Sequence, residues 1–215
     1  MLLKGEAQRL GVNFEFNTTV AGVNRSSNAS VLIANEMQPR SYDAVVICAG
    51  LDSAALLKPL GLNIPLAAVH GYSVSAHIRE PLNAPRSALM DERYKVAISR
   101  LGQRVRVAGS AEIGGNPNTK RASSLQTLYK VLHDWFPGAA LMSSGVQEWK
   151  GARPMLPDGP PVIGASGIPG VWLNLGHGSS GWALSCGSAR ALADLVAGRV
   201  PEVDLEGLGV ERFAG

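Results

Sequence analysis

The chain has 215 residues, of which 46% are hydrophobic and 17% are charged, and its formal net charge is +3. These values are typical of a globular protein with enough residues for one large domain or two small ones. The basic residues are scattered, which argues against a nucleic-acid partner because nucleic acids bind clustered positive charge. No apolar run approaches the roughly 18 residues of a membrane-spanning helix, so no such helix is predicted.

The first ten residues predict a helix. Leu3, Ala7 and Leu10 recur at helical spacing, and Gly11 is a candidate C-terminal cap. No N-cap precedes them, so the chain is expected to begin inside an element.

Short strands are expected next. Strand character recurs at residues 12–16, 18–23 and 30–34, with a polar turn at 24–28. The run YDAVVICA at 42–49 is mostly apolar, which is typical of a parallel strand buried on both faces. Gly50 ends this run and lets the backbone pass close to a ligand or simply makes a turn.

From residue 64 to 147 the pattern changes to that of an antiparallel sheet. Strands are expected at residues 69–78, 87–99 and 103–110. One amphipathic helix interrupts them, and its core face is expected to consist of Leu125, Leu128, Leu132 and Trp135. We therefore expect a sheet with one helix packed on it, inserted between the two ends of the first domain.

The segment 149–164 reads WKGARPMLPDGPPVIG and contains one arginine, Arg153. We expect Arg153 in a loop stiffened by Pro157, Pro160 and Pro161. A guanidinium fork matches a carboxylate in a bidentate way and stays charged when desolvated. Arg153 is therefore a candidate carboxylate ligand, and a surface ion pair is the alternative.

A strand at 171–175, a glycine-rich turn and a helix at 183–197 follow. The turn GHGSSG at 176–181 matches the dinucleotide fingerprint G-x-G-x-x-G letter for letter. That fingerprint also needs a second strand ending in an acidic residue about 20 residues on, and the corresponding region here is still helix. We therefore predict a helix N-terminus that faces an anionic ligand, and not a Rossmann turn.

The two blocks GARPMLPDGPPVIG and VWLNLGHGSSGWALSCGSARALADLVAGR resemble the C-terminal signature of flavin-dependent D-amino acid dehydrogenases. Their wider family includes D-amino acid oxidase, glycine oxidase and sarcosine oxidase. YDAVVICAG, VHGYS and GSAEIGG extend the resemblance over nearly the whole chain. The resemblance implies a mixed α/β and α+β fold. An incomplete, Rossmann-like FAD-binding domain is expected at 1–65 and 148–215, and an antiparallel-sheet substrate (cap) domain at 66–147.

One feature of the family is missing. Such proteins open with a strand, a G-x-G-x-x-G turn and a helix that hold the ADP half of FAD, and this sequence has no such opening. It resembles the C-terminal half alone and is short by about 100–200 residues. The chain is then a fragment, a subunit that receives the missing half from a partner chain, or a remnant without redox chemistry.

The resemblance also implies site residues. Arg153 would bind the substrate α-carboxylate, and Tyr72 would orient the carboxylate or the amine, with a half-buried strand tyrosine as an equal alternative. The implied cofactor set is Val20, Ala49, Gly50, Gly176, His177, Gly178, Ser179, Ser180, Gly181 and Trp182. Within it, Val20 would meet the adenine end of FAD, and the 176–182 turn would lie against the pyrimidine edge of the flavin.

The implied reaction is FAD-dependent oxidative deamination of a D-amino acid to a 2-oxo acid and ammonia. Glycine or sarcosine is the alternative substrate. Hydride transfer to flavin needs a neutral amine and correct placement, so no catalytic base is assigned, and His177 is interpreted as structural or as a hydrogen-bonding partner of the flavin.

No metal site is expected, because His70, His77 and His133 lack metal-ligand spacing. Cys48 and Cys186 are predicted to be buried free thiols, compatible with a reducing compartment. The expected location is cytoplasmic, and peripheral association with the inner membrane is left open.

Overall fold

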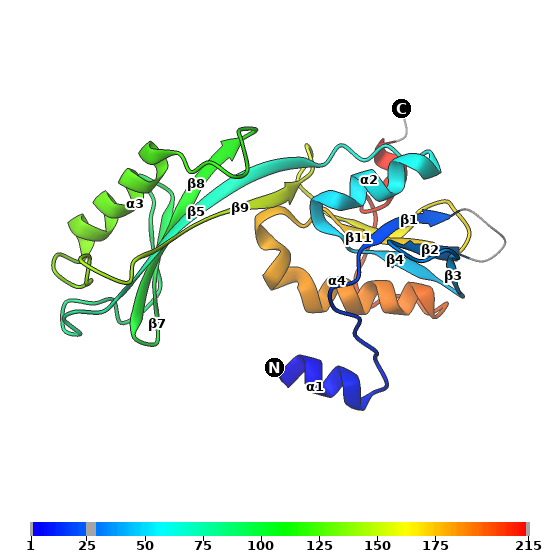
Figure 1. Ribbon diagram of the computed structural model, residues 1–215, viewed down its shortest axis with the longest axis horizontal. Coiled ribbons are helices and arrows are strands. Elements are labelled where there is room, and N and C mark those ends of the chain that lie inside the picture. The colour runs from blue at the N-terminus through cyan, green and yellow to red at the C-terminus, as the bar shows by residue number, and fades with distance from the viewer. Residues whose placement is uncertain (1, 25–28, 214–215) are drawn as a thin grey trace. The chain divides into compact units, whose positions relative to one another are not determined.

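The computed structural model describes residues 2–24 and 29–213 (Figure 1). These residues form two compact units. The first combines the segments Met1–Ile64, Val162–Leu175 and Cys186–Gly215, and the second combines Pro65–Pro161 and Gly176–Ser185. The chain therefore leaves the first unit after Ile64 and returns to it at Val162.

Two three-stranded sheets make up the described strands of the first unit. One is antiparallel with the order β1-β2-β3, whose bounds are Val20–Asn24, Ala29–Ile33 and Arg40–Tyr42. The other has the order β10-β11-β4, whose bounds are Val162–Ala165, Val171–Leu175 and Val45–Ile47. β10 and β11 are antiparallel, whereas β4 runs parallel to β11. β4 is therefore an edge strand that offers a parallel edge.

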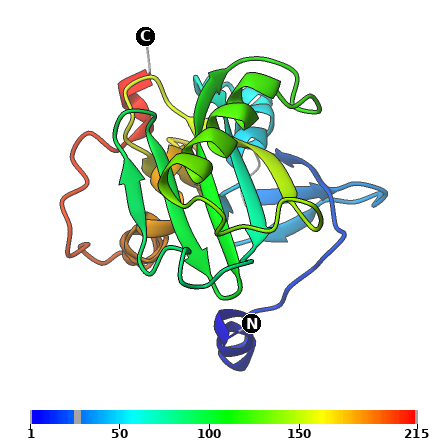
Figure 2. The ribbon, with the colours of Figure 1, turned by 90° about the vertical axis from the view of Figure 1, so that its left-hand side faces the viewer.

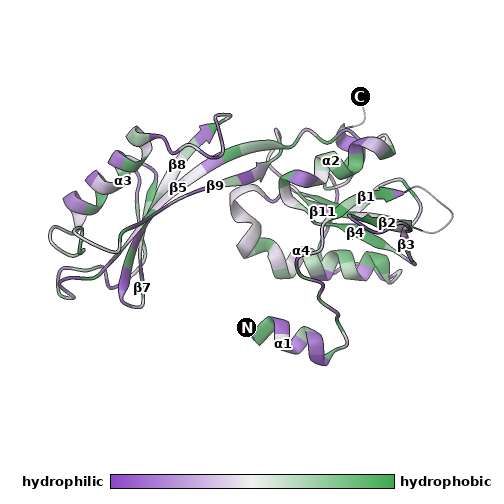
Figure 3. Ribbon diagram, in the orientation of Figure 1, coloured by the Kyte–Doolittle hydropathy of each residue, from purple (hydrophilic) through white to green (hydrophobic). Residues whose placement is uncertain are grey.

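The helices of this unit are short, except for α4 (Gly181–Val196). The short ones are α1 (Leu2–Arg9), η1 (Gly50–Asp52), α2 (Ser53–Leu57), η2 (Lys58–Leu60) and η4 (Val210–Phe213). α4 begins in the second unit and ends in the first. Hydrophobic residues run along α4 and β4 (Figure 3).

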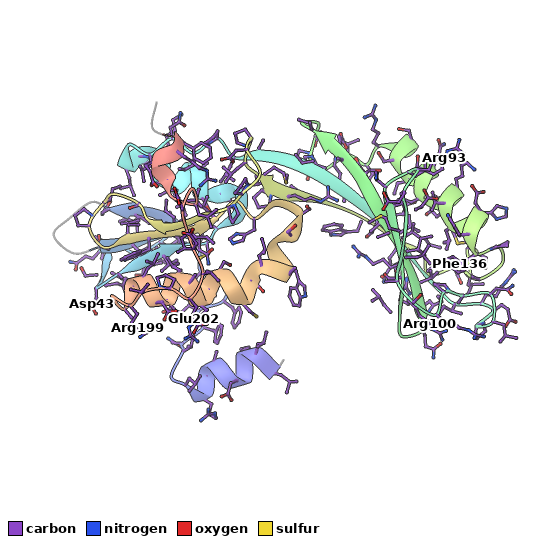
Figure 4. All side chains as sticks on the ribbon, turned by 180° about the vertical axis from the view of Figure 1, so that it is seen from behind. Asp43, Arg93, Arg100, Phe136, Arg199 and Glu202 are labelled. Carbon is purple, nitrogen blue, oxygen red and sulfur yellow. The ribbon has the colours of Figure 1, made fainter. Side chains whose placement is uncertain are left out.

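A buried carboxylate anchors the end of α4. Asp194 accepts hydrogen bonds from Arg190 Nε at 3.0 Å and from Arg199 Nε at 2.9 Å. Arg190 also pairs with Glu202, which lies with Arg199 at the C-terminal end of the helix (Figure 4). The guanidinium of Arg199, followed by that of Arg190, lowers the pKa of the Asp194 carboxyl below its ordinary value.

Most elements that the sequence predicts for this unit are present. α1, β1 and β2 confirm the first helix and the strands at 18–23 and 30–34, and β4 confirms a parallel strand. The strand predicted at 12–16 is wrong: Phe14 and Phe16 stack on each other with centroids 6.0 Å apart and do not pair with a sheet. The predicted turn at 24–28 falls largely outside the described residues.

Burial of β4 on both faces is also a wrong prediction. Val46, whose side chain points to one face of this short edge strand, is 42% exposed, whereas its neighbours Val45 and Ile47 are buried. Both cysteines are free but exposed, against the predicted burial.

The second unit is built on a five-stranded antiparallel sheet of order β6-β7-β8-β5-β9. The bounds are Leu89–Asp91, Val96–Leu101, Arg104–Ile113, Ala67–His77 and Gln147–Met155. α3 (Ala122–Trp135) lies across one face of this sheet (Figure 2). The core between them contains Tyr72, Val74, Ala76, Val96, Ile98, Val105, Val107, Leu125, Leu128, Val131 and Leu132.

The other face of the sheet is made by the alternate residues of the same strands, since successive side chains in a strand point to opposite faces. β9 pairs with β5 along its whole length, so that Val69 lies opposite Arg153 and Gly71 opposite Gly151. This second face, called the α3-distal face below, carries Gly71, Ser73, Trp149, Gly151 and Arg153.

The pairing of β9 moves the domain boundary. Residues 148–161 and 176–185 belong to the unit of the antiparallel sheet, whereas the sequence placed them with the FAD-binding domain. The reason is that β9 extends the sheet and the turn after β11 packs against β9.

Two details of the sheet also differ from the prediction. The strand expected at 87–99 is a hairpin, β6 and β7, whose turn includes Lys95 at φ +53°. Trp135 is 54% exposed and its indole N–H donates to Asp91 at 2.7 Å, so Val131 takes its place in the core.

Candidate active site

Arg153 lies in strand β9 and not in the predicted loop. Pro154 follows it within the strand, and a proline is tolerated there because β9 is the edge of the sheet. The three prolines expected to stiffen a loop around Arg153 come after β9 ends at Met155. Arg153 is therefore held by a strand ladder, which fixes its position better than a loop does.

The Arg153 guanidinium occupies the space above Gly71 of the neighbouring strand. A Cβ built on Gly71 would lie 2.5 Å from Cζ and 2.7 Å from Nη1 of Arg153, too close for any real side chain. Nη1 donates to the carbonyl oxygen of Ser110 at 3.2 Å. No carboxylate in the described part of the chain forms an ion pair with Arg153. Because a guanidinium has five N–H donors, this half-buried cation keeps donors for an anion.

Tyr72 lies on the opposite face of the same sheet. Its side chain is 1% exposed in the core under α3, and its hydroxyl donates to the carboxylate of Glu112. The backbone N–H of Arg121 donates to the same hydroxyl at 3.1 Å. The structure therefore does not bring Tyr72 and Arg153 together, because adjacent positions of β5 and β9 alternate between faces.

Tyr72 belongs to a buried polar network. Lys150 Nζ lies 3.1 Å from Glu112 Oε2 and donates to the carbonyl oxygens of Asn116 and Thr119, each at 2.9 Å. The hydroxyl of Tyr72, followed by the ammonium of Lys150, lowers the pKa of Glu112. This network ties the segment between β8 and α3 to the sheet, which is a structural role.

The glycine-rich turn after β11 leads into α4 as predicted. η3 (Gly178–Ser180) is followed at once by α4, and the helix continues where a dinucleotide fold would place a second strand. Gly176 and Gly178 adopt φ +77° and +55°. A Cβ on Gly178 would lie 2.5 Å from Met155 Sδ, so the turn contacts β9 here, and the positive φ of Gly178 favours glycine. The first backbone N–H groups of α4 have no partner within the helix.

His177 stands in this turn with a buried nitrogen that has no partner. Its Nε2 is a buried polar atom without a hydrogen bond in the described structure. Burial lowers the pKa of the imidazole, which favours the neutral ring. A neutral imidazole without a partner can donate to or accept from a bound group.

Arg153 and the turn lie on the same face of β9. Met155, two residues after Arg153 and hence on the same face, meets Gly178 with its sulfur. Two residues of a strand span about 6.6 Å. The guanidinium of Arg153 lies over Gly71, the residue opposite Gly151, and so leans along the strand away from Met155. Ser179, Ser180 and Trp182 of the predicted cofactor set are exposed in this turn and the start of α4.

Three predicted cofactor residues belong to the first unit. Val20 lines a cavity of about 350 Å³ with Arg40, Tyr42 and other residues. Ala49 is exposed and Gly50 opens η1 directly after β4. Nothing lies within 4 Å of a Cβ built on Gly50, so a ligand can approach this backbone closely.

The sequence profile of the family described as DAO, FAD dependent oxidoreductase, matches residues 2–195. The chain belongs to this family. FAD is the cofactor on which the family depends.

Relatives of this DAO-family chain are about twice as long. A D-amino acid dehydrogenase of Rhizobium johnstonii is 42% identical over 211 residues, which cover 98% of this chain and 50% of the relative. A D-amino acid dehydrogenase of Bradyrhizobium diazoefficiens is 43% identical over 212 residues, which cover 99% of this chain and 50% of the relative. The chain thus spans about half the length of the curated relatives it matches.

Solved structures share the fold. Glycine oxidase from Geobacillus kaustophilus superposes with a TM-score of 0.80 at 23% identity, covering 91% of this chain and 52% of that one. L-Proline dehydrogenase from P. horikoshii superposes with a TM-score of 0.82 at 15% identity, covering 98% of this chain and 57% of that one. The fold of this DAO-family chain therefore corresponds to about half of each of these two proteins.

The DAO-family turn at 176–182 fits the chemistry of a flavin. The buried, unpartnered Nε2 of His177 supplies a hydrogen-bonding atom, and the positive end of the helix dipole at the start of α4 favours negative charge. Side chains here are small or exposed, so backbone and imidazole are available to a planar group.

Sequence reasoning missed Gly71 and Trp149. Both are present in the motifs VHGYS and WKGARP, and a glycine inside a strand often marks a close approach of another group. The sequence does not show which side chain fills the space above Gly71, because that side chain, Arg153, is on the paired strand β9.

No group of three or more histidine, cysteine or acidic residues that could hold a metal occurs within residues 2–24 and 29–213. The same described residues contain no helix that is both long and apolar enough to cross a membrane.

Proposed function

We propose that this chain is the substrate-binding half of an FAD-dependent D-amino acid dehydrogenase, which deaminates D-amino acids oxidatively to 2-oxo acids and ammonia. The observation that carries the proposal is the Arg153 guanidinium, which has donors to spare and no acidic partner in the described chain. The D-amino acid dehydrogenases that are 42–43% identical support the choice of substrate.

Arg153 binds the α-carboxylate of the substrate through two parallel N–H···O bonds. Its orientation is set by the carbonyl oxygen of Ser110 and by the space above Gly71. Anchoring the carboxylate at a strand ladder holds Cα in one place, and such positioning is a large part of catalysis.

The turn at 176–182 would hold the flavin of FAD, with the N–H groups that begin α4 and the imidazole of His177 as its hydrogen-bonding partners. Bound FAD supplies the hydride acceptor. Val20, Ala49 and Gly50 are proposed, from the resemblance to the family, to meet the rest of the cofactor.

The edge strand β4 of the first unit is the proposed docking edge for the half of the relatives that this chain does not cover. β4 pairs with β11 alone, in parallel, among the described strands. An apolar cavity of about 420 Å³ adjoins it and is lined by Val46, Cys48, Asn174, Ala189, Leu192, Ala193, Val196 and Ala197. Parallel sheets are normally covered on both faces, and an open edge is a template for another strand. We infer that the complementary half adds a parallel strand at β4, in the same polypeptide or from a partner chain.

Co-expression tests both parts of this proposal. The chain is produced alone and together with the half of the Rhizobium johnstonii dehydrogenase that it does not cover. We expect the pair to co-purify with the absorbance bands of a bound flavin, and D-amino acids to bleach those bands under exclusion of oxygen.

The possible failures are distinct. A flavin-loaded complex that D-amino acids do not bleach contradicts the activity and leaves the docking edge intact. A mixture that neither associates nor binds FAD contradicts the docking edge and favours a non-catalytic remnant. Bleaching by glycine or sarcosine in preference to larger D-amino acids replaces the substrate with these amines.

A further inference from the structure

Two glycines face each other across β5 and β9 on the α3-distal face. Gly71 and Gly151 are directly opposite residues of the strand pair. Neither has a Cβ, so together they leave a bare patch of backbone on this face. The two glycines form a floor of bare backbone, and the side chains of Arg153 and Trp149 fill the space directly above it.

Two large side chains lean over this floor. The Arg153 guanidinium lies above Gly71, where its Cζ is 2.5 Å from the position of a Cβ. The Trp149 indole lies above Gly151, where its Cζ3 is 2.8 Å from the position of a Cβ. Opposite Cβ positions are about 4.5–5.5 Å apart, so the indole and the guanidinium are no more than about 11 Å apart.

Trp149 is available to a ligand. Its side chain is 56% exposed although it is large and apolar. Small-molecule sites are lined mainly by hydrophobic and aromatic side chains, with a few polar or charged groups that fix the orientation of the ligand. The indole therefore offers an apolar surface beside the carboxylate-binding guanidinium.

The charge of this face selects against cationic ligands. Arg104 and Arg106 lie on it, as their pairing with His77 and Ser75 shows. Glu112 and Glu148 belong to the other face, where they accept hydrogen bonds from Tyr72 and Tyr129. No strand residue of the α3-distal face is acidic within the described sheet. A substrate with a basic side chain finds no counter-charge here.

We propose that Trp149 determines specificity: its indole receives the side chain of an amino acid whose carboxylate is bound by Arg153. The substrates are accordingly D-amino acids with a neutral, apolar or aromatic side chain. This inference rests on the proposed function for the identity of the ligand as an amino acid.

Binding of simple carboxylates tests the inference without turnover. The probes are acetate, hexanoate and phenylacetate, which share one charge and differ in apolar size. Their dissociation constants for the full chain are measured by ligand-observed NMR, with circular dichroism to confirm that each variant is folded. We expect phenylacetate and hexanoate to bind more tightly than acetate.

The variants separate the two side chains. Trp149→Ala should weaken phenylacetate and hexanoate about tenfold, the effect of losing one buried apolar contact surface, and should leave acetate within about twofold. Trp149→Phe should restore most of the affinity. Arg153→Ala should weaken all three probes. Trp135→Phe is the matched control, because Trp135 is similarly exposed, at 54%, but lies on α3.

Each outcome supports or overturns the inference. Equal weakening of all probes by Trp149→Ala, or no weakening, overturns it. Failure of every probe to bind the unsubstituted chain overturns it as well. If Arg153→Ala leaves all affinities unchanged, Arg153 is not the carboxylate site and that part of the proposed function is wrong. If Arg153→Ala weakens binding and Trp149→Ala does not, only the role of Trp149 is overturned.

Discussion

The guanidinium of Arg153 fills the space that a side chain on Gly71 would need. The two residues lie on adjacent strands of one ladder, and a Cβ on Gly71 would be 2.7 Å from Arg153 Nη1. The conformation of Arg153 therefore depends on a residue that makes no polar contact with it.

The first prediction follows from this fit. Gly71→Ala should displace the guanidinium and raise the dissociation constant of acetate about tenfold or more. The cost in stability should be small, because the guanidinium is the far end of a flexible side chain and can move aside. Carboxylate titration and urea unfolding measure the two effects. Gly5→Ala is the control, since nothing lies within 4 Å of a Cβ at Gly5. If G71A binds acetate as tightly as the unsubstituted chain does, Gly71 does not set the conformation of Arg153.

Arg153→Lys should weaken substrate binding with less effect on the chemical step. Lysine keeps the charge but cannot form the bidentate fork. In the FAD-loaded complex we expect KM for a D-amino acid to rise about tenfold or more, and kcat to fall by a smaller factor. Steady-state kinetics give both values. An unchanged KM removes Arg153 from the substrate site.

Tyr72→Phe distinguishes a structural tyrosine from a substrate-binding one. The hydroxyl bonds to Glu112 and to the N–H of Arg121 in the core, so its loss should destabilise the chain by about 1 kcal/mol for each hydrogen bond. Carboxylate affinity should not change, because Tyr72 and Arg153 are on opposite faces. Thermal unfolding and acetate titration provide the readouts, and a loss of acetate affinity in a folded Y72F variant would restore Tyr72 to the substrate site.

Asp194 should make the stability of the first unit sensitive to acid. Arg199 and Arg190 lower the pKa of Asp194 in the folded chain, so the folded state binds this proton more weakly than the unfolded state. The stabilisation is fully present above the unfolded-state pKa of about 3.9 and is lost as pH falls through the lower folded-state pKa. Urea unfolding from pH 7 to pH 2 measures the free energy of unfolding of the unsubstituted chain and of Asp194→Asn. The gap between these two free energies should close only below about pH 4. A gap that stays constant over this range would exclude the ion pairs as its source.

Val46→Lys should block assembly with the complementary half. Val46 is an exposed apolar residue of the β4 edge strand, and a lysine on an edge strand opposes the addition of another strand. Co-purification of the two halves should fall severalfold. Ile113→Lys is the control, because Ile113 is exposed at the end of β8. Equal co-purification of both variants would place the interface elsewhere.

Local patterns predicted much of the fold. The apolar spacing of Leu125, Leu128 and Leu132 indicated α3, and all three are in its core. The turn at 176–181 was correctly separated from a dinucleotide fingerprint, because the helix after it continues to Val196. Such features depend on neighbours in the sequence, and residue periodicity therefore reveals them.

The position of Arg153 was not predictable in this way. The prolines around Arg153 indicated a loop, whereas the free edge of the sheet accommodates Pro154 in a strand. Likewise, Trp135 has the spacing of a core residue, but its indole N–H donates to Asp91 of strand β6.

The amino-acid sequence by itself determined the family and the order of most elements, and it indicated Arg153 as the candidate carboxylate ligand. The tertiary structure alone decided which face of the sheet each residue occupies, separating Tyr72 from Arg153 and bringing Trp149 beside it. The physical reason is that a strand alternates its side chains between two faces, while only its pairing with another strand sets which residues become neighbours.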